Sequence, residues 1–465
     1  MTKGIPMSNS TRLQPALDYL AADLHGSLVR PGDPDWDTAR RPWNRSVDQH
    51  PLAVATPRDV HDVTRILAAA RAGGFGVTVQ PRGHGATNDC SDCILVRTSA
   101  FDEITIDNAH RVARVGSGIS WGTLLARLEG TGLIALAGSS PDVSVTGYLL
   151  SGGHSWFSRW QGLAAHSIRA VELVDGRGDV CRVTPESNPE LLWALRGGGG
   201  LFGVVTLLEI DLFEAPELFG GRLVFDAGSA EVVLTQVAAI MADAPNELSI
   251  FAGLINMPDI EMVPEPMRGN SFATVDVVFV GSAARGAELL APLLTSVVPL
   301  MDQTRVFPIS RLGEVSADPD EPVPALDWGA TLTEVTPDTI GALVAGFRAA
   351  SSAGLTMLQL RPLGGAIRPD ARGNSPAGVV GSLSAEYIIF AAALLMDPSR
   401  QVDDHVFDPL RAATAGTTVP RSPLSLLSSS FTIADAMAPE DIAHLAEIKR
   451  TVDPQGVMRS NVPLA

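Results

Sequence analysis

Two repeating patterns of apolar residues run along the first part of the chain and predict its elements. Between residues 60 and 70, valine, isoleucine and leucine recur three or four positions apart, which is the spacing of a helix with one buried face. Thr56 precedes this segment and is followed by Pro57, so we expect Thr56 to be the N-cap of the helix. The apolar segments 51–55 and 77–80 predict strands on either side, and the three elements together predict a βαβ unit.

The same patterns continue through the rest of the chain. They predict helices over 13–26 and 121–130 and short strands near 94–96, 104–106 and 112–115. The turn residues Asp-Gly-Arg-Gly lie between two β-branched runs and predict a hairpin over 171–183. Beyond residue 212, apolar strands such as 271–280 alternate with amphipathic helices such as 283–298, which indicates an α+β region with an antiparallel sheet.

The composition is that of an ordinary folded protein and argues against some classes of function. The chain has 465 residues, which is too long for one ordinary core, so we expect two domains. Its net charge of −18 argues against nucleic acid as a partner, because phosphate binding depends on clustered lysine and arginine. No apolar run reaches the roughly 18 residues of a membrane span. Residues 1–10 lack the apolar core of a signal peptide, so we expect a cytoplasmic protein without membrane contact.

The three cysteines are few, which fits a reducing compartment. Cys90 and Cys93 have the Cys-x-x-Cys spacing of redox and zinc sites, but only Cys181 remains to join them. No set of metal ligands emerges, and we expect no metal site. We interpret the pair as part of a structural loop, with a disulfide or redox role as the alternative.

Two glycine-rich segments are the strongest candidates for ligand binding. In the first, Gly83-His84-Gly85 follows a predicted strand. Glycine permits positive φ and close approach of the backbone, so such a turn can wrap N–H groups around an anion; the alternative is a tight turn with an incidental imidazole. In the second, the four glycines at 197–200 precede a β-branched strand. Their large loss of backbone entropy on folding suggests backbone packed against a flat or phosphorylated ligand.

These two segments, together with residues 151–163 (Ser-Gly-Gly-His-Ser-Trp-Phe-Ser-Arg-Trp-Gln-Gly-Leu), resemble the PCMH-type FAD-binding oxidoreductases. The resemblance is strongest to the berberine-bridge-enzyme-like branch, which includes 6-hydroxynicotine oxidases and bacterial natural-product oxidases. It covers residues 33–212 and returns at 444–461 with a closing helix and an Asp-Pro turn.

This resemblance implies a two-domain α+β fold of the vanillyl-alcohol-oxidase type. Residues 1–212 and 416–465 would form an FAD-binding domain of two lobes. Residues 213–415 would form a substrate-binding domain with an antiparallel sheet covered by helices.

The resemblance also implies FAD as the cofactor, attached covalently through His84. The cofactor-binding residues that it implies are Arg82, Gly83, His84, Gly85, Ala86, Ser139, Ser140, Val145, Gly147, Gly152, Gly153, Val204 and Asn461. Ser140 stands where many relatives have a second attaching cysteine, and a hydroxyl does not replace a thiolate, so we expect a single covalent bond. Val145 takes the place of a small residue that gives oxygen access to the flavin, which favours an oxidase.

The catalytic residues are less well defined. Relatives carry a Tyr-x-Asn motif near the C-terminus, whereas this chain has Ser430-Phe431-Thr432 at the best match and so lacks the phenol that helps to deprotonate the substrate. Gln359 and Arg361 match a strand that lines the active site in the family, and alternation would place both on one face. Either would orient a carbonyl, and Arg361 would stabilise an enolate. Tyr387 is a third candidate if it faces the cavity, and is otherwise a packed sheet tyrosine.

The function that the resemblance implies is oxidation of a small natural-product intermediate. Hydride would pass from a substrate C–H bond to flavin N5, and O2 would reoxidise the flavin. The missing Tyr-x-Asn motif leaves a redox-neutral cyclase or isomerase, or an oxygenating flavoenzyme, as the alternative. A nicotinamide dehydrogenase lacks support because no Gly-x-Gly-x-x-Gly follows an early strand, and a flavin-binding protein without catalysis is a further alternative. We expect a monomer or a homodimer.

Overall fold

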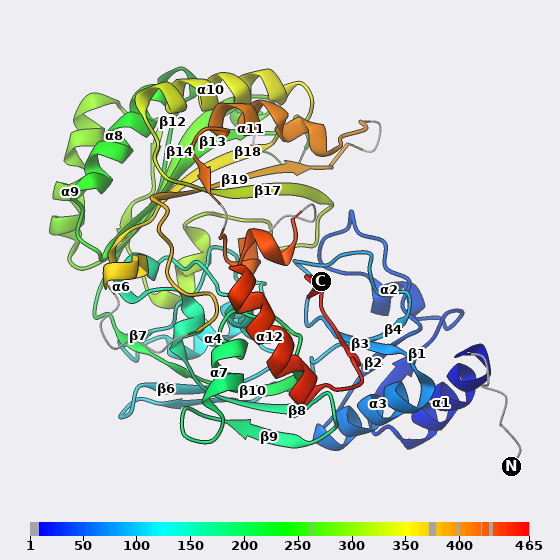
Figure 1. The fold of residues 1–465 in the computed structure, drawn as a ribbon. Coiled ribbons are helices and arrows are strands. Elements are labelled where there is room, and N and C mark those ends of the chain that lie inside the picture. Colours follow the sequence, from blue (N-terminus) through cyan, green and yellow to red (C-terminus); the bar gives the residue numbers. More distant parts are fainter. Residues whose placement is uncertain are drawn as a thin grey trace, which may run out of the picture.

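The computed structural model shows two stacked domains (Figure 1). The structure describes residues 9–261, 263, 265–371, 378–397, 400–419, 421–426 and 431–464. A nine-stranded sheet forms one domain, and two five-stranded sheets with a short two-stranded one form the other, which contains both ends of the described chain. Within the described residues, no helix has the length and apolar character needed to cross a membrane.

The first small sheet brings the two ends of the chain together. Its strand order is β1 (Ser27–Val29), β2 (Ala53–Thr56), β4 (Cys93–Val96), β3 (Gly76–Val79) and β21 (Met458–Arg459). All neighbours except β1 and β2 are parallel. Helix α3 (Val60–Gly73) connects β2 to β3, which confirms the predicted βαβ unit, and α1 (Asn9–Asp23) packs in the same core. Helix α2 (Trp36–Arg40) lies between β1 and β2.

The predicted N-cap of α3 is wrong by three residues. Thr56 belongs to β2, where it pairs with Ser27. Asp59 is the N-cap, and its carboxylate accepts a hydrogen bond from the Asp62 N–H at 2.9 Å. Threonine and aspartate are both strong N-cap residues, so the pattern of residue types did not distinguish the two positions.

The second small sheet is antiparallel throughout. Its strand order is β5 (Ile104–Asp107), β6 (Val112–Gly116), β10 (Gly203–Asp211), β8 (Ile168–Asp175) and β9 (Val180–Val183). Strands β8 and β9 form the predicted hairpin. Four helices share a hydrophobic core with this sheet: α4 (Trp121–Leu128), α5 (Val145–Leu150), α7 (Pro189–Leu195) and α12 (Pro439–Val452). The short elements nearby are α6 (Ser158–Gln161) and the paired strands β7 (Leu133–Ile134) and β11 (Phe213–Glu214).

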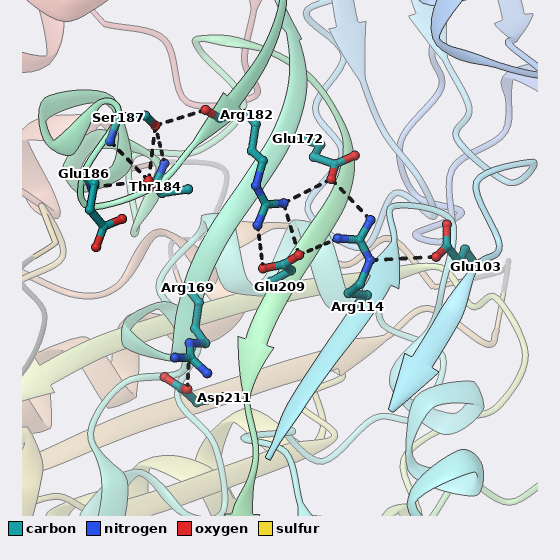
Figure 2. Close-up of polar contacts among 10 residues, drawn as sticks. All are labelled: Glu103, Arg114, Arg169, Glu172, Arg182, Thr184, Glu186, Ser187, Glu209 and Asp211. Atoms are coloured by element: carbon teal, nitrogen blue, oxygen red, sulfur yellow. Dashed lines mark hydrogen bonds and ion pairs between the residues drawn. The ribbon is translucent and has the colours of Figure 1, made fainter. Parts of the chain in front are cut away.

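The outer face of the second sheet carries two arginines and two glutamates on four neighbouring strands (Figure 2). Arg114 on β6 pairs in register with Glu209 on β10, and Glu172 on β8 pairs with Arg182 on β9. Arg182 also bonds Glu209 at 2.9 Å, and Arg114 bonds Glu172 at 3.3 Å. Each exposed pair contributes only about 0–1 kcal/mol. Because opposite charges stand across from each other in both registered pairs, they favour this register and keep the face polar.

The nine-stranded sheet is antiparallel and forms the second domain. It consists of β12 (Leu218–Asp226), β13 (Leu248–Asn256), β14 (Ser271–Val280), β15 (Met301–Asp302), β16 (Arg305–Val306), β17 (Ala325–Leu332), β18 (Met357–Pro362), β19 (Tyr387–Leu394) and β20 (Thr418–Val419). Its outer face is covered by α8 (Ala230–Ala242), α9 (Ala283–Ser296), α10 (Pro337–Ser351) and α11 (Asp408–Thr414) (Figure 1). Because β20 pairs with β17, this sheet extends to Val419, beyond the boundary expected at 415.

Side chains on the central strands alternate between two different surroundings. Ala252 and Leu254 on β13, with Leu358 and Leu360 on β18, belong to the core under the helices. Phe251, at the intervening position of β13, belongs instead to the core that the second small sheet shares with its helices. The two-residue period of a strand therefore turns one row of side chains toward the helices and the next row toward the other domain.

A buried ion pair fixes the returning C-terminal segment. The Lys449 ammonium donates to the Asp453 carboxylate at 2.7 Å and also to the carbonyls of Leu201 and Met458 at 3.0 and 2.9 Å. The same carboxylate accepts the N–H groups of Val457 and Met458 at 2.8 and 2.9 Å. Since β21 begins at Met458, these contacts place the last strand of the first sheet.

We expect Asp453→Ala to lower the free energy of unfolding by about 3–5 kcal/mol, because it leaves Lys449 largely buried without its counter-charge. Urea unfolding followed by tryptophan fluorescence measures the change. Glu447→Gln, on the exposed side of the same helix, is the matched control and should change the free energy by less than about 0.5 kcal/mol. Equal effects of the two substitutions would show that the pair does not hold the C-terminal segment.

Candidate active site

The loop after β3 carries the predicted histidine and is held by the segment before β2. The Trp43 N–H donates to the Arg82 carbonyl at 3.0 Å. The Trp43 indole stacks on the His84 imidazole with ring centres 4.2 Å apart. Gly83 has a φ of 90°, and a Cβ there would lie 2.8 Å from Pro42, so this turn requires glycine. Ala86 is buried directly after the turn.

The loop that contains Ser139 and Ser140 lies beside this turn. The Arg82 guanidinium donates to the Asp142 carboxylate at 2.6 Å, which joins the two loops. Ser139 and Ser140 are both partly buried. The Ser140 Oγ is buried and has no hydrogen-bond partner among the described residues.

The C-terminal segment closes the same region from the other end of the sequence. The Asn461 side-chain amide donates to the Gly85 carbonyl at 2.7 Å. The structure therefore brings together three of the predicted cofactor segments, which contain His84, Ser140 and Asn461.

The predicted glycines 152 and 153 are explained by packing within the protein. Gly152 has a φ of 98°, and a Cβ there would lie 2.9 Å from the Val380 side chain. Gly153 has a φ of 66°, and its Cβ would lie 2.4 Å from the Tyr148 ring. A Cβ at Gly197, in the four-glycine run, would also meet Val380 at 2.4 Å. The protein's own side chains thus lie against backbone that we expected to face a ligand.

The remaining predicted cofactor residues lie on α5 and β10. Val145 is fully buried at the start of α5. The Gly147 N–H is bonded by the hydroxyl of the N-cap Ser144 at 3.2 Å. Val204 on β10 belongs to the core of the first small sheet. Val145 and Val204 therefore support the fold directly, and the Gly147 amide already has a partner within the chain.

Burial controls the electrostatics of His84. Desolvation, with a smaller contribution from the nearby Arg82 charge, lowers the pKa of the imidazole to about 4. The His84 Nε2 atom is buried and has no hydrogen-bond partner among the described residues. At neutral pH this group is therefore an uncharged imidazole with an unpaired ring nitrogen, which is the form needed for nucleophilic attack.

The predicted pair on the substrate side lies on the face turned toward the FAD-binding lobe. Gln359 and Arg361 on β18 are both buried, and the guanidinium donates two hydrogen bonds, of 2.8 and 3.2 Å, to the side-chain amide oxygen of Gln359. The Arg361 Cζ lies 4.5 Å from the centre of the Phe251 ring and 5.2 Å from that of Phe390. The predicted alternation of residues 359 and 361 is confirmed.

Two polar side chains of the FAD-binding lobe, His154 and Tyr148, lie near the sheet face that carries Arg361. The His154 ring lies 5.6 Å from Phe251, and burial lowers the pKa of its imidazole to about 3. Tyr148 contacts Trp121 edge-on at 5.5 Å, and burial raises the pKa of its phenol. The charge of Arg361 acts on both groups. All of these groups except Arg361 are therefore neutral near pH 7.

The structure places Tyr387 away from this group. Tyr387 packs with the core under the helices, on the same side of β19 as Ile389. Of the two alternatives left open for Tyr387, the structure favours the packed sheet tyrosine, because its position in the strand has the opposite parity from that of Phe390. Phe431 also packs against the helix-side core. Ser430, the first residue of the weak motif match, lies outside the described residues.

The arrangement fits an FAD molecule. Among the described residues, several polar atoms in this region are buried without a hydrogen-bond partner: His84 Nε2, Ser140 Oγ, Thr146 Oγ1, Tyr148 Oη, His154 Nδ1 and Trp156 Nε1. Each such atom costs about 1–3 kcal/mol, and folded proteins rarely leave them unsatisfied. They come from the segments that the sequence assigned to the flavin, and a polar ring system with a phosphate chain would supply their partners.

Comparisons with known proteins agree with this fit. Residues 51–184 match the family model for an FAD binding domain. The (R)-6-hydroxynicotine oxidase of Paenarthrobacter nicotinovorans is 31% identical over 242 residues, which are 50% of this chain and 52% of that protein. The FAD-dependent monooxygenase prx3 of Penicillium roqueforti is 28% identical over 244 residues, which are 51% and 48% of the two chains. The aligned part of the chain thus spans about half the length of these curated relatives.

Solved structures establish the fold over nearly the whole chain. 6-Hydroxy-D-nicotine oxidase from Arthrobacter nicotinovorans has a TM-score of 0.80 at 23% identity, covering 95% of this chain and 98% of that chain. Berberine bridge enzyme from Eschscholzia californica has a TM-score of 0.80 at 15% identity, covering 97% and 98%.

The chain therefore has the α+β vanillyl-alcohol-oxidase fold with a PCMH-type FAD-binding domain, and the predicted fold class is confirmed. Residues 51–184 carry the FAD binding domain, and 6-hydroxynicotine oxidase is among the proteins to which the chain is similar.

Sequence reasoning missed the aromatic groups that surround the polar ones. Trp43 and Phe251 lie outside the glycine-rich motifs, and nothing in their neighbourhoods suggested a ligand. For Phe251 the strand alternation was the available signal. Odd-numbered positions of β13 lie on the same sheet face as Gln359 and Arg361.

The structure also gathers ligand-type residues that the sequence left apart, at the start of α3. His25, Asp59, His61 and Asp62 place potential metal-ligating atoms within 4.8 Å of one another. The Asp62 carboxylate, however, accepts the N–H groups of His25, Gly26 and Arg58, each at 2.8 Å. Asp59 bonds the His25 ring at 2.9 Å. We interpret the cluster as a hydrogen-bond network that joins the residues just before β1 to the start of α3.

We expect Asn461→Ala to loosen the loop around His84, because it removes the only side-chain hydrogen bond that the described C-terminal segment makes to that loop. The loss of about 1 kcal/mol should raise amide exchange of residues 83–88 roughly fivefold. Hydrogen–deuterium exchange with mass spectrometry measures this. Gln455→Ala, in the exposed turn before β21, serves as the control. Unchanged protection of residues 83–88 in Asn461→Ala would show that the loop is held by other contacts.

Proposed function

We propose that the protein is an FAD-dependent oxidase that acts on a small natural-product intermediate. The observation that carries the proposal is that two surfaces face each other. Unpaired buried polar atoms of the FAD-binding lobe face the Gln359–Arg361 pair of the sheet, whose charge acts on Tyr148 and His154. Bound FAD would accept hydride from a substrate C–H bond and return the electrons to O2, giving hydrogen peroxide.

In this proposal His84 forms a single covalent bond to the flavin. The neutral imidazole and its unpaired Nε2 supply the nucleophile, and stacking on Trp43 fixes the ring. Ser140 offers a hydroxyl rather than a thiol, so a second bond is not expected. The other predicted cofactor residues, from Arg82 to Asn461, act by shaping the loops that hold the ring and the pyrophosphate.

On the substrate side, Gln359 and Arg361 act as the orienting groups. Both lie on the sheet face that is turned toward the FAD-binding lobe, and the Gln359 amide holds the guanidinium in place. The pair would orient a substrate carbonyl and stabilise an enolate. Tyr387 takes no part, because it packs on the other face of the sheet. Val145, buried at the start of α5, would govern access of O2.

We further propose that the enzyme works in the cytoplasm as a monomer or homodimer. Support comes from the thiols of Cys90 and Cys93, which are both buried and free. Burial raises the pKa of both thiols, which disfavours the reactive thiolate and supports a structural rather than a redox role.

A second function, oxygen transfer or a redox-neutral cyclisation, is favoured by one observation. Phe431 stands where relatives carry the phenol that assists deprotonation, and it packs against the helix-side core. Among the relatives, prx3 is named a monooxygenase. Product mass separates the three reactions. Oxidation removes two hydrogens, isomerisation leaves the mass unchanged, and oxygenation adds one oxygen atom.

We expect His84→Ala to release its flavin into the supernatant after precipitation with trichloroacetic acid, whereas the parent protein keeps the yellow colour in the pellet. The reason is the loss of the only imidazole at the attachment position. Absorbance of the two fractions near 450 nm measures the outcome. His110→Ala, which removes an exposed histidine, should behave as the parent does. Retention of flavin in the His84→Ala pellet would place the attachment elsewhere, and release from the parent protein would exclude a covalent bond.

The oxidase reaction is tested without knowledge of the substrate by reducing the purified protein with dithionite under anaerobic conditions and mixing it with O2. We expect rapid reoxidation with one hydrogen peroxide formed per flavin, because oxidases of this kind return both electrons to O2. Slow reoxidation would indicate a dehydrogenase, and a protein that neither contains nor binds FAD would refute the proposal.

A further inference from the structure

Arg361 presents a charge that the fold does not neutralise. Only 8% of the residue is exposed, and within the described residues its only hydrogen bonds go to the neutral Gln359 amide, at 2.8 and 3.2 Å. It has no ion-pair partner in the described part of the chain, and the carboxylates of Asp276 and Asp318 act on it only over a longer range.

The same sheet shows how this protein treats a buried arginine that serves structure. Arg222 on β12 is paired with Asp276 on β14 through two hydrogen bonds of 2.6 and 2.8 Å. The Ser316 hydroxyl adds a further bond to Asp276 at 3.1 Å. Asp276 is thus already committed, and Arg361 lies on the sheet without an equivalent partner.

A buried cation without a counter-charge is strongly unfavourable. Burial lowers the pKa of Arg361, yet a guanidinium does not lose its proton in proteins. Removing such a charge from water costs several kcal/mol, which an opposite charge or several hydrogen-bond acceptors must offset. The buried Arg159 has the carbonyls of Leu248, Leu363 and Ala244 as acceptors, whereas Arg361 has the single Gln359 amide oxygen among the described residues. Without a negatively charged group against Arg361, part of this desolvation cost therefore remains and lowers the stability of the fold.

The walls around Arg361 are flat, aromatic and otherwise uncharged. Phe251 and Phe390 come from the two strands that flank β18, and Gly253, directly across from Gln359, presents no side chain. On the facing side, His154 keeps an unpaired Nδ1 and Tyr148 an unpaired phenol oxygen, and both groups are neutral near pH 7. The Asp276 carboxylate, opposite Phe251 on β14, is already bonded to Arg222, so Arg361 differs from Arg222 in having no carboxylate partner among the described residues.

We propose that Arg361, Gln359, Phe251 and Phe390 form a subsite for an anionic group of the substrate, a carboxylate or an enolate carried on a planar unsaturated ring. The guanidinium binds the anion, and the partly buried Phe390 ring packs against the flat scaffold. Phe251, which stacks on Trp156 with ring centres 3.8 Å apart, supports the guanidinium. His154 and Tyr148 are placed to hydrogen-bond the part of the substrate nearer the flavin. This inference deepens the proposed function and rests on it, since it assigns the substrate class of that same site.

The test compares two isosteric probes that differ in charge. Holoenzyme is titrated with benzoate and with benzamide, and binding is followed by the flavin difference spectrum and by calorimetry. We expect benzoate to bind about 10–100-fold more tightly, since a hydrogen bond to a charged group contributes about 1.5–3 kcal/mol. Arg361→Met should abolish the preference, and Arg361→Lys should retain part of it. Arg285→Gln, at an exposed arginine, is the control and should keep the full preference.

Stability gives a second readout that distinguishes a binding arginine from a structural one. Because Arg361 is buried and unpaired, Arg361→Met should unfold at a higher urea concentration than the parent protein. Arg222→Met, which breaks the paired arginine of the same sheet, should unfold at a lower one. A lower midpoint for Arg361→Met would mean that the guanidinium supports the fold.

The outcomes separate this inference from the proposed oxidase activity. Equal binding of benzoate and benzamide, or binding of neither, by a protein that carries flavin and reduces O2 would overturn the anionic subsite alone. A benzoate preference that depends on Arg361, in a protein that does not reduce O2, would overturn the oxidase and leave the subsite in place. An unchanged preference in Arg361→Met would show that the anion binds elsewhere.

Discussion

The two-residue period of the central strands is the constraint on which the rest of the molecule depends. Strand β18 must fill a hydrocarbon core with Leu358 and Leu360 and at the same time present Gln359 and Arg361 to the other domain. A strand does this without any bend, because neighbouring side chains point in opposite directions. The same parity brings Phe251 and Phe390 beside Arg361 and takes Tyr387 away from it.

Buried charge is distributed unequally over this framework. Lys449 and Arg222 each have a carboxylate within hydrogen-bond distance, and both pairs hold elements of the fold together. Arg361 has only a neutral amide. Arg159, which is also buried, bonds the carbonyls of Leu248, Leu363 and Ala244, so Arg361 differs from it in having a single neutral acceptor among the described residues.

The sequence predicted the fold class, the βαβ unit, the hairpin and the side on which Gln359 and Arg361 lie, because each depends on local spacing or on specific ordered motifs. It failed where two local choices were equally good, as with Thr56 and Asp59 at the start of α3. The side of the sheet that Tyr387 occupies stayed open, because the sequence did not show which of the alternating positions of β19 faces the helices. Trp43 and Phe251 were missed because their roles arise only from contacts between distant segments.

The return of the C-terminal segment to the first sheet has a consequence for how the protein is made. Strand β21 pairs with β3, and Asn461 bonds the loop that follows β3. On the ribosome, β3 emerges long before β21 is synthesised, so the loop around His84 remains unclamped while almost all of the chain is translated. The nine-stranded sheet, whose strands lie between residues 218 and 419, is complete in sequence before the first sheet is. The loop around His84 therefore gains its Asn461 contact only after every strand of the nine-stranded sheet has been synthesised.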